Sequence, residues 1–436
     1  MKRETELVIA ELSPTGEGVG IIETGGERRA VFVSDVLVGE RVMAAIDLSR
    51  RPARGKLLRV VEPSRARVES PCAHVAKCGG CNWMHLTTNA QTDAHAAIVR
   101  SILPPAFRST AVLAHPVGPN LGYRTRARVH LEAGRSGKIA VGMFARSSHD
   151  AVAVDRCVVL HPAIEKGRLS IERWISGSRG RGEAHFSLGA LPSSANGDRK
   201  VVLDLRWSSD FEGAVFGRIE RAVQEGELAG ARIFSGAVRK PAVIGDPTPW
   251  IAGADGVPLR LGPGGFSQAN ETCNVTLAKR VAELATQAAP EAAKVMELYA
   301  GAGNLSVLLA ARFDLTTVES DSEACAAARK NLADRSLRAR VTEADAATFE
   351  IPKPTKLVVL DPPRTGAREV MRALAARSVH SALGVLYVSC DPPTLGRDLT
   401  TLAEAGYRLE HVETFEMFPQ TSHVETVALL VRKPAS

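Results

Sequence analysis

A cysteine at the end of an apolar run is the first feature of this sequence that could do chemistry. Cys390 follows the segment 384–389 and is itself followed by Asp391, Pro392 and Pro393. An Asp-Pro-Pro sequence cannot continue a strand, because proline lacks the backbone N–H and has a fixed φ. In an open parallel sheet, ligands bind beyond the carboxyl ends of the strands. The thiol is therefore placed for nucleophilic chemistry, although a cysteine there can also be a small core residue.

Two acids stand at the ends of other apolar runs and could act together with that thiol. Asp361 follows the apolar run 357–360 and precedes two prolines, and Glu425 begins an apolar run near the C-terminus. A thiolate that adds to an electron-poor ring can make the neighbouring ring carbon nucleophilic, and once that carbon has taken a new group, a base must remove its proton so that the thiolate can leave. Glu425 is one candidate base, because an acid at the start of an apolar strand is unfavourable unless it is used, although a purely structural role is the alternative. His423, whose ordinary pKa is ~6.5, is the alternative base.

A glycine-rich turn between a predicted strand and a predicted helix indicates a cofactor site. The turn spans 298–304, with Ser306 at the third glycine position of a dinucleotide fingerprint. The glycines alone are therefore compatible with NAD, another nucleotide or S-adenosylmethionine. Glu319 ends the following strand, about where a carboxylate binds ribose hydroxyls, and Asp345 fits the position at which class I methyltransferases bind adenine. This ordered set, together with Asp361, favours S-adenosylmethionine.

The cysteines divide into a cluster and scattered positions. They number seven, which is odd, and no signal peptide is visible, so a disulfide framework is not expected. Cys72, Cys78 and Cys81 lie close together in the sequence and Cys157 follows, and these four predict a metal or iron–sulfur site. Spacing alone does not separate a four-cysteine zinc site from a [4Fe–4S] cluster. The scattered cysteines are Cys273, Cys325 and Cys390.

The composition is that of a globular protein large enough for two or three domains. The chain has 436 residues, of which 45% are hydrophobic and 24% charged. No apolar run reaches the ~18 residues of a membrane span, and no apolar leader follows Met1, so a cytoplasmic protein without a membrane partner is expected. The net charge is +7, and basic residues gather between Arg50 and Arg67. That cluster suits RNA phosphates, with a solvated basic face as the alternative.

Patterns in the first 258 residues predict the elements that precede the catalytic residues. Residues 5–64 contain short apolar runs separated by glycine turns, which is typical of a small closed barrel. An amphipathic helix is predicted over 88–103, where two prolines end it. Residues 121–258 are strand-rich, apart from the Gly/Ser-rich polar stretch 176–200, which predicts a loop.

From residue 259 onward, strands and helices alternate, which indicates a parallel α/β sheet. Cys390 and Asp361 would then end neighbouring strands of that sheet. The segments 407–417 and 424–432 close the chain as a predicted hairpin. The other predicted strands are 295–298, 315–319, 356–360 and 385–390, and the predicted helices are 304–312 and 322–333.

Taken together, these motifs resemble the RNA 5-methyluridine methyltransferases, and in particular the branch that modifies uracil C5 in 23S ribosomal RNA. The resemblance implies a class I S-adenosylmethionine-dependent methyltransferase domain of α/β fold at 259–436. It also implies a TRAM-type, OB-like barrel that binds RNA at 1–64 and a strand-rich iron–sulfur domain at 65–258. The motifs that carry it are Cys72-x5-Cys78-Gly79-Gly80-Cys81, Asp155-Arg156-Cys157, Phe266-Ser267-Gln268-Ala269-Asn270, Gly301-Ala302-Gly303-Asn304, Asp361-Pro362-Pro363, Ser389-Cys390-Asp391-Pro392 and His423-Val424-Glu425-Thr426.

The resemblance also assigns roles to individual residues. It implies that Cys390 is the nucleophile and Glu425 the base. The residues implied around the cofactor or the target uracil are Gln268, Tyr299, Gly301, Gly303, Asn304, Glu319, Asp345 and Asp361. The residues implied to hold a [4Fe–4S] cluster are Cys72, Cys78, Cys81 and Cys157. The sequence departs from the family pattern at Asp391, where Asn is common, so the stabilisation of the neighbouring thiolate is in question.

The expected reaction is methylation of a 23S ribosomal RNA uridine by a monomer that flips the target base out of its stack. Three alternatives remain. A cytosine-C5 methyltransferase uses the same thiol addition, but the dipeptide Ser389-Cys390 is unlike the Pro-Cys of the DNA enzymes. A transfer-RNA uridine is a second possible target. A non-catalytic iron–sulfur RNA-binding protein is disfavoured, because it has no use for both Cys390 and Glu425.

Overall fold

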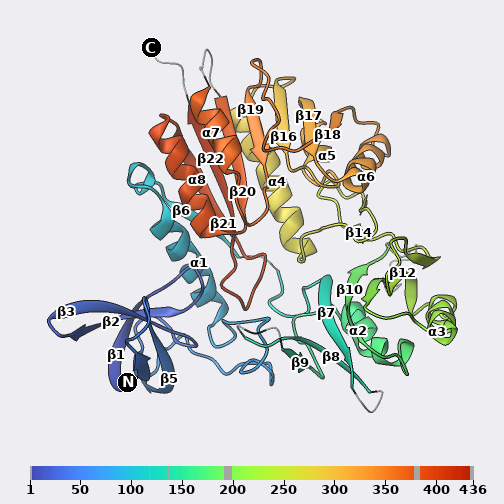
Figure 1. Cartoon of the computed structure of the whole chain (residues 1–436). Coiled ribbons are helices and arrows are strands. Elements are labelled where there is room, and N and C mark those ends of the chain that lie inside the picture. Colours follow the sequence, from blue (N-terminus) through green and yellow to red (C-terminus); the bar gives the residue numbers. More distant parts are fainter. Residues whose placement is uncertain are drawn as a thin grey trace.

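The structure, a computed structural model, describes residues 2–116, 118–134, 138–146, 148, 150–190, 199–377 and 383–432. An N-terminal barrel, a central sheet and a larger C-terminal sheet follow one another along the chain (Figure 1). Helix α1 lies between the barrel and the C-terminal sheet in that view. Among the described residues, no helix is both long and apolar enough to cross a membrane.

The N-terminal strands form a closed barrel in the order β1-β2-β3-β5-β4, which confirms the barrel predicted from the glycine-separated runs. Inward and outward residues alternate along β4, where Val42, Ala44 and Ile46 are buried. This period of two is that of a strand with one face in the core. The strands are β1 Lys2–Leu12, β2 Gly18–Thr24, β3 Glu27–Val33, β4 Arg41–Asp47 and β5 Ala53–Glu62.

The central region contains a seven-stranded sheet in the order β13-β12-β11-β10-β7-β8-β9, as the strand-rich pattern predicts. Two helices that the pattern did not indicate pack on this sheet. The strands are β7 Arg126–Ala133, β8 Ile139–Phe144, β9 Ala151–Ala153, β10 Arg181–Leu188, β11 Val201–Trp207, β12 Leu228–Ser235 and β13 Ala242–Gly245. The helices are α2 Pro162–Trp174 and α3 Gly213–Gln224, and a two-stranded ribbon follows, β14 Trp250–Ile251 and β15 Leu259–Arg260.

The prediction of a loop over 176–200 is wrong for part of that stretch. Strand β10 runs through it and pairs with β7 and β11. Ala184, Phe186 and Leu188 alternate into the core, while the polar residues between them concealed this short apolar face. Residues 191–198 of the predicted loop lie outside the described residues.

The C-terminal sheet has eight strands in the order β18-β17-β16-β19-β20-β22-β21-β6, which confirms the predicted α/β architecture. Strands β16 to β20 are parallel, and β22 runs antiparallel to both of its neighbours. The strands are β6 Val112–His115, β16 Lys294–Leu298, β17 Asp314–Glu319, β18 Arg340–Glu343, β19 Leu357–Leu360, β20 Leu383–Ser389, β21 Arg408–Phe415 and β22 Glu425–Arg432. The nearby helices are α1 Thr88–Ile102, η1 Pro105–Phe107, α4 Glu271–Ala288, α5 Ser306–Leu309, α6 Ser322–Ala333, α7 Arg368–Ala376 and α8 Pro392–Glu404.

Helices cover both faces of this sheet. Residues of α1, α7 and α8 share one apolar core with the sheet, and residues of α4 share another on the opposite face. Every residue of β20 is buried, as expected for a parallel strand covered on both sides. Gly396 allows α8 to approach the end of α1, because a Cβ there would lie 2.7 Å from the Ile102 carbonyl oxygen.

The N-terminal part of the chain contributes one strand, β6, to the C-terminal sheet. Strand β6 belongs in sequence to the segment predicted as the central domain, yet it is the edge strand of the C-terminal sheet and runs parallel to β21. The predicted domain limits at residues 64 and 258 stay predictions, but α1 and β6 lie with the C-terminal sheet in space. The end of β21, which leads toward Glu425, is therefore supported by residues from the first third of the chain.

Candidate active site and cysteine cavity

Cys390 lies directly after β20, at the carboxyl end of the sheet, and its side chain is partly exposed. Asp391 is the N-cap of α8, since its side chain accepts a hydrogen bond from the backbone N–H of Thr394 at 2.9 Å. Pro392 occupies the first position of that helix, where its missing N–H is not needed. Asp and Asn are equally good N-caps, so the departure from the family pattern leaves the local backbone role intact.

The pairing of β20 with β22 brings Glu425 near Cys390. Strands β20 and β22 are antiparallel, with Ser389 opposite Thr426. Cys390 and Glu425 are the next residues beyond that pair, one on each strand, and the charge of Glu425 raises the pKa of the Cys390 thiol, so the two side chains lie close together. His423 lies outside β22 and is exposed. The geometry therefore favours Glu425 over His423 as the base.

Glu425 is a fully buried carboxyl without a hydrogen-bond partner. Neither of its side-chain oxygens, Oε1 or Oε2, meets a donor among the described residues. Burial raises the pKa of Glu425 well above its ordinary range, the nearby Asp361 raises it further, and Arg364 opposes the rise. A buried polar group without a partner is costly, and such groups cluster at functional sites.

Asp361 follows β19, the neighbour of β20, so the two predicted strand ends do meet at one edge. Desolvation raises the pKa of Asp361 to about 7, and a hydrogen bond with Gln268 opposes that rise. Gln268 thereby reaches the same edge from the segment before α4. Close to it, Phe266 is 74% exposed, and the Arg126 guanidinium lies 5.4 Å from its ring centre.

Arg364 is a charged residue of this site to which the sequence reasoning gave no role. Burial and the charges of Glu425 and Asp361 raise the pKa of the Cys390 thiol to about 12, and Arg364 is the cation that opposes them. Arg364 also lowers the pKa of Glu425. The sequence could have indicated this residue, because Arg364 directly follows Asp361-Pro362-Pro363.

The glycine-rich turn after β16 has the backbone that a close approach to a ligand requires. Gly301 and Gly303 have φ values of +55° and +88°, and a Cβ on Gly303 would lie 3.3 Å from that of Ala328 on α6. Tyr299 has φ +62°, a conformation that is rare for a residue with a bulky side chain. Glu319 accepts a hydrogen bond from the Gly301 N–H at 2.9 Å, so this carboxylate closes the turn onto β17.

Asn304 and Asp345 flank the same turn. The amides of Asn304 and Asn274 exchange two hydrogen bonds, at 2.9 and 3.1 Å. Asn274 lies on α4 and is buried, and it was not anticipated because nothing in the sequence marks a single Asn in a helix. Asp345 follows β18, and its side chain accepts a hydrogen bond from the Ala347 N–H at 2.9 Å. Residues from four strand ends thus converge around the turn and Asp361.

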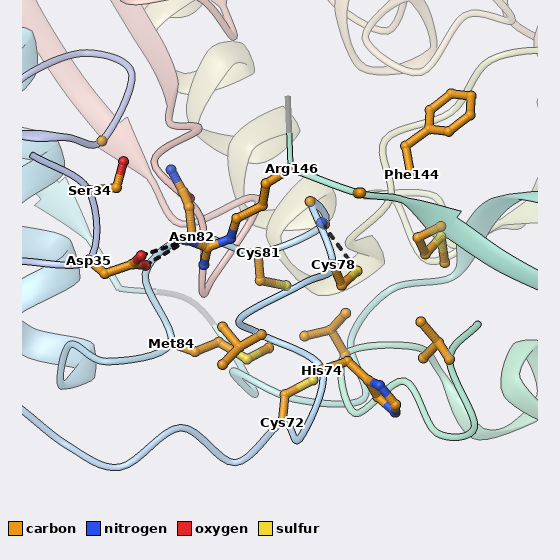
Figure 2. A pocket seen from close by; sticks show the side chains of 18 of the residues that line it. Ser34, Asp35, Cys72, His74, Cys78, Cys81, Asn82, Met84, Phe144 and Arg146 are labelled. Carbon is orange, nitrogen blue, oxygen red and sulfur yellow. Dashed lines mark hydrogen bonds and ion pairs between the residues drawn. The ribbon is translucent and has the colours of Figure 1, made fainter. Parts of the chain in front are cut away.

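The four clustered cysteines line one cavity of about 940 Å³ between the barrel and the central sheet. Figure 2 shows Cys72, Cys78 and Cys81 around it, with Asn82 beside Cys81. Burial raises the pKa of Cys81 to about 12, and Cys157, Cys78 and Cys72 add to the rise through their charges. Among the described residues, no three His, Cys, Asp or Glu side chains are grouped so as to hold a single metal ion.

Basic side chains line the same cavity. Arg146 makes an ion pair with Asp35 of the barrel at 2.7 Å, which bridges the barrel and the segment after β8 (Figure 2). Of the sequence cluster 50–67, three arginines are engaged in ion pairs: Arg50 with Asp47, Arg54 with Glu17 and Arg67 with Glu40. The exposed members of the cluster are Arg50, Arg51, Lys56, Arg59 and Arg65.

The chain is similar in sequence to known RNA methyltransferases. A family model described as tRNA (Uracil-5-)-methyltransferase matches residues 339–433. The 23S rRNA (uracil(1939)-C(5))-methyltransferase RlmD of Halomonas elongata is 32% identical, over 98% of this chain and 89% of that protein. RlmD of Pseudomonas entomophila is also 32% identical, over 98% and 93%.

Among solved structures, the Pyrococcus abyssi tRNA (uracil-54, C5)-methyltransferase in complex with S-adenosyl-L-homocysteine is similar over its whole length. The TM-score is 0.73 at 20% identity, with 98% of this chain and 99% of that chain covered. At this level of identity the similarity concerns the fold, and it includes the domains on both sides of the cysteine cavity.

Proposed function

Because the chain belongs to the RNA uracil-C5 methyltransferase family, we propose that it methylates C5 of a uridine in 23S ribosomal RNA. The single observation that carries the proposal is the pairing of Ser389 with Thr426, which leaves Cys390 and the buried, unpartnered Glu425 as the next residues on the two strands. Similarity over nearly the full length to ribosomal RNA enzymes favours ribosomal over transfer RNA. The methyl donor is S-adenosylmethionine, whose sulfonium supplies an electrophilic methyl group.

The first step of the proposed reaction is addition of Cys390 to uracil C6. The S–C6 bond forms as the thiol proton is lost, and C5 of the resulting enolate then takes the methyl group. The thiol pKa of about 12 already includes the opposing charge of Arg364, so the proton is lost only as the S–C6 bond forms. Without the positive charge of Arg364, the thiolate would form less readily still.

The second step is removal of the C5 proton by Glu425, as the S–C6 bond breaks and the thiolate leaves. Glu425 must be ionised when it accepts this proton, and Arg364 favours the ionised form. An acceptor with a raised pKa holds the proton more strongly once it has been transferred. The fully buried position of Glu425 keeps water away from the transfer.

Residues around the glycine turn are proposed to bind the methyl donor. Gly301 and Gly303 allow a ligand to approach the backbone closely. Glu319 is proposed to accept hydrogen bonds from ribose hydroxyls, and Asp345 from the adenine amino group. The remaining residues proposed to surround the cofactor and the uracil are Gln268, Tyr299, Asn304 and Asp361.

The cavity cysteines are proposed to hold a [4Fe–4S] cluster. Burial and the charges of the other three cysteines raise the pKa of Cys81, so this thiol forms a thiolate readily only when a cationic metal group binds it. This donor set fits a cluster ligated by Cys72, Cys78, Cys81 and Cys157. The flanking RNA is proposed to lie along the basic barrel, with the target base flipped toward Cys390. In this proposal the protein acts as a monomer in the cytoplasm.

The test is methylation of purified 23S rRNA and of a transfer-RNA pool, with 5-methyluridine mapped by mass spectrometry. We expect incorporation into one region of 23S rRNA, and incorporation only into transfer RNA would overturn the substrate. Glu425→Gln should accumulate a covalent RNA–protein adduct on a denaturing gel, because elimination then lacks its base. Absence of that adduct, when the wild-type protein is active, would contradict the assignment of Glu425.

A further inference from the structure

The segment between β21 and β22 delivers Glu425 and is held from outside the C-terminal sheet. Its residues Gln420, Thr421 and Ser422 are 8%, 4% and 6% exposed, although they form a polar turn. Gln420 has φ +72°, a left-handed conformation that surrounding contacts must maintain. We call residues 416–424 the catalytic turn, since Glu425 follows it directly.

Asn82, the residue after the cavity residue Cys81, binds the catalytic turn through two reciprocal hydrogen bonds. Its Nδ2 donates to Ser422 Oγ at 3.0 Å, and its Oδ1 accepts from the Ser422 N–H at 2.9 Å. The backbone N–H groups of Asn82 and Trp83 both donate to the Gln420 carbonyl, at 3.2 and 3.0 Å. Asn82 and Ser422 are 340 positions apart in the chain.

Helix α1 holds the catalytic turn from a second side. Gln91 accepts from the Gln420 N–H at 2.7 Å and donates to Gln420 Oε1 at 3.2 Å. His95 is fully buried and bridges the turn, with Nδ1 2.9 Å from Glu416 Oε1 and Nε2 3.0 Å from the Thr421 carbonyl. Gln91 also donates to the Trp83 carbonyl. Helix α1 and residues 72–83, which we call the cysteine segment, therefore hold the catalytic turn together.

The barrel also contacts the cysteine segment, at Gly16. The Trp83 indole N–H donates to the Gly16 carbonyl at 3.0 Å, and the ring is buried. A Cβ on Gly16 would lie 2.6 Å from both Asn82 Nδ2 and Ser422 Cβ. Asn82 is thus enclosed between the barrel and the catalytic turn, with no room for displacement toward Gly16.

We propose that Asn82 is a positioning residue for Glu425, so that the cysteine site controls the proton-removal step of the reaction. The inference rests on the proposed function, because it assigns a role within that reaction. Cys81 and Asn82 are adjacent, so any rearrangement of the cysteine segment is transmitted through two backbone and two side-chain hydrogen bonds to the turn. Ser422 is three residues from Glu425, a span of at most ~10 Å of extended chain.

The expected size of the effect follows from the tolerance of catalytic geometry. A displacement of ~1 Å at a reacting group can reduce a rate by ~10²-fold. Cys390 and Asp361 are supported by β19, β20 and α8 rather than by Asn82. Loss of the Asn82 contacts should therefore slow elimination by ~10–100-fold, while addition and methyl transfer change little.

The test uses the full-length, cluster-loaded protein and a 23S rRNA fragment that the wild-type protein methylates. Asn82→Ala should accumulate the methylated covalent adduct in a single turnover, and amide hydrogen exchange should quicken within 418–424. Ser422→Ala removes only the bond from Asn82 Nδ2, because the Ser422 N–H still donates to Asn82 Oδ1, so it should give the same adduct at a lower level. The double variant should match Asn82→Ala alone, since Asn82→Ala already removes the bond that Ser422→Ala breaks.

Asn120→Ala is the matched control, because it truncates the same type of side chain, whose Nδ2 donates to Thr88 Oγ1 and which makes no hydrogen bond to the catalytic turn within the described part of the chain. It should leave both the adduct level and exchange within 418–424 as in the wild type. Equal slowing of all steps of the reaction in Asn82→Ala, or an adduct no more abundant than in Asn120→Ala, would overturn the role of Asn82. If Glu425→Gln also forms no adduct, the proposed function itself has failed, which is a distinguishable result.

A second arm tests the link to the cysteine site. Cys81→Ser should lose iron, and exchange within the catalytic turn should quicken as in Asn82→Ala. Unchanged exchange within 418–424 in a variant without iron would overturn control by the cysteine site, whatever its activity. This readout does not depend on methyl transfer by the loaded protein.

Discussion

Arg364 gives the sharpest prediction about how the nucleophile is activated. With a pKa of about 12 for Cys390, only ~10⁻⁴ of the thiol is ionised at pH 8. Arg364 is the cation that opposes this rise, and an opposite charge within ~4–6 Å shifts a pKa by ~1–3 units. Because Arg364 is exposed and therefore screened by solvent, the lower end of that range applies. Arg364→Met should raise the pKa of Cys390 by ~1 unit.

The assay is the rate of alkylation of Cys390 by iodoacetamide at pH 8, followed by mass spectrometry of the peptide that contains it. Only the thiolate reacts, so Arg364→Met should be alkylated ~10-fold more slowly than the wild type. Arg368→Met is the matched control, since it removes an exposed arginine four residues away on α7. Equal rates for Arg364→Met and wild type, or equal slowing in both variants, would refute the reasoning.

Three further variants or measurements test other parts of the site. Cys390→Ala should abolish methyl transfer while S-adenosylmethionine binding, measured by calorimetry, is retained; full activity would contradict the nucleophile. Asp391→Asn should keep the melting temperature, because Asn also caps helices, and should speed alkylation of Cys390, because a neighbouring negative charge is removed; slower alkylation would contradict this. Anaerobically purified protein should be brown with ~4 iron per chain, whereas stoichiometric zinc would refute the cluster.

The strand ends of the catalytic sheet could be predicted because local patterns encode them. The apolar runs before Asp361 and Cys390 read as strands, and proline after each acid fixes where the strand stops. Parallel order then brings both residues to one edge without further information. The barrel could be predicted in the same way, since glycine turns separate its short apolar runs.

Other features could not be predicted because they depend on contacts or environments that no local pattern records. Strand β10 was concealed by polar residues on its exposed face. The pairing of Asn304 with Asn274 joins two elements whose distance only the folded chain defines. The role of Asp391 as a helix cap required the backbone geometry after β20.

The catalytic turn is the clearest case of this difference. The sequence marks Glu425 as unusual, because an acid begins an apolar strand, but it gives no reason for the polar residues that precede it. In the structure, Gln420 and Ser422 are buried by partners from the first quarter of the chain. A polar turn within a sheet edge is stable only when such partners satisfy it. The turn that precedes the proposed base therefore depends on the cysteine segment and α1 for this conformation. The Asn82 and Cys81 variants measure that dependence.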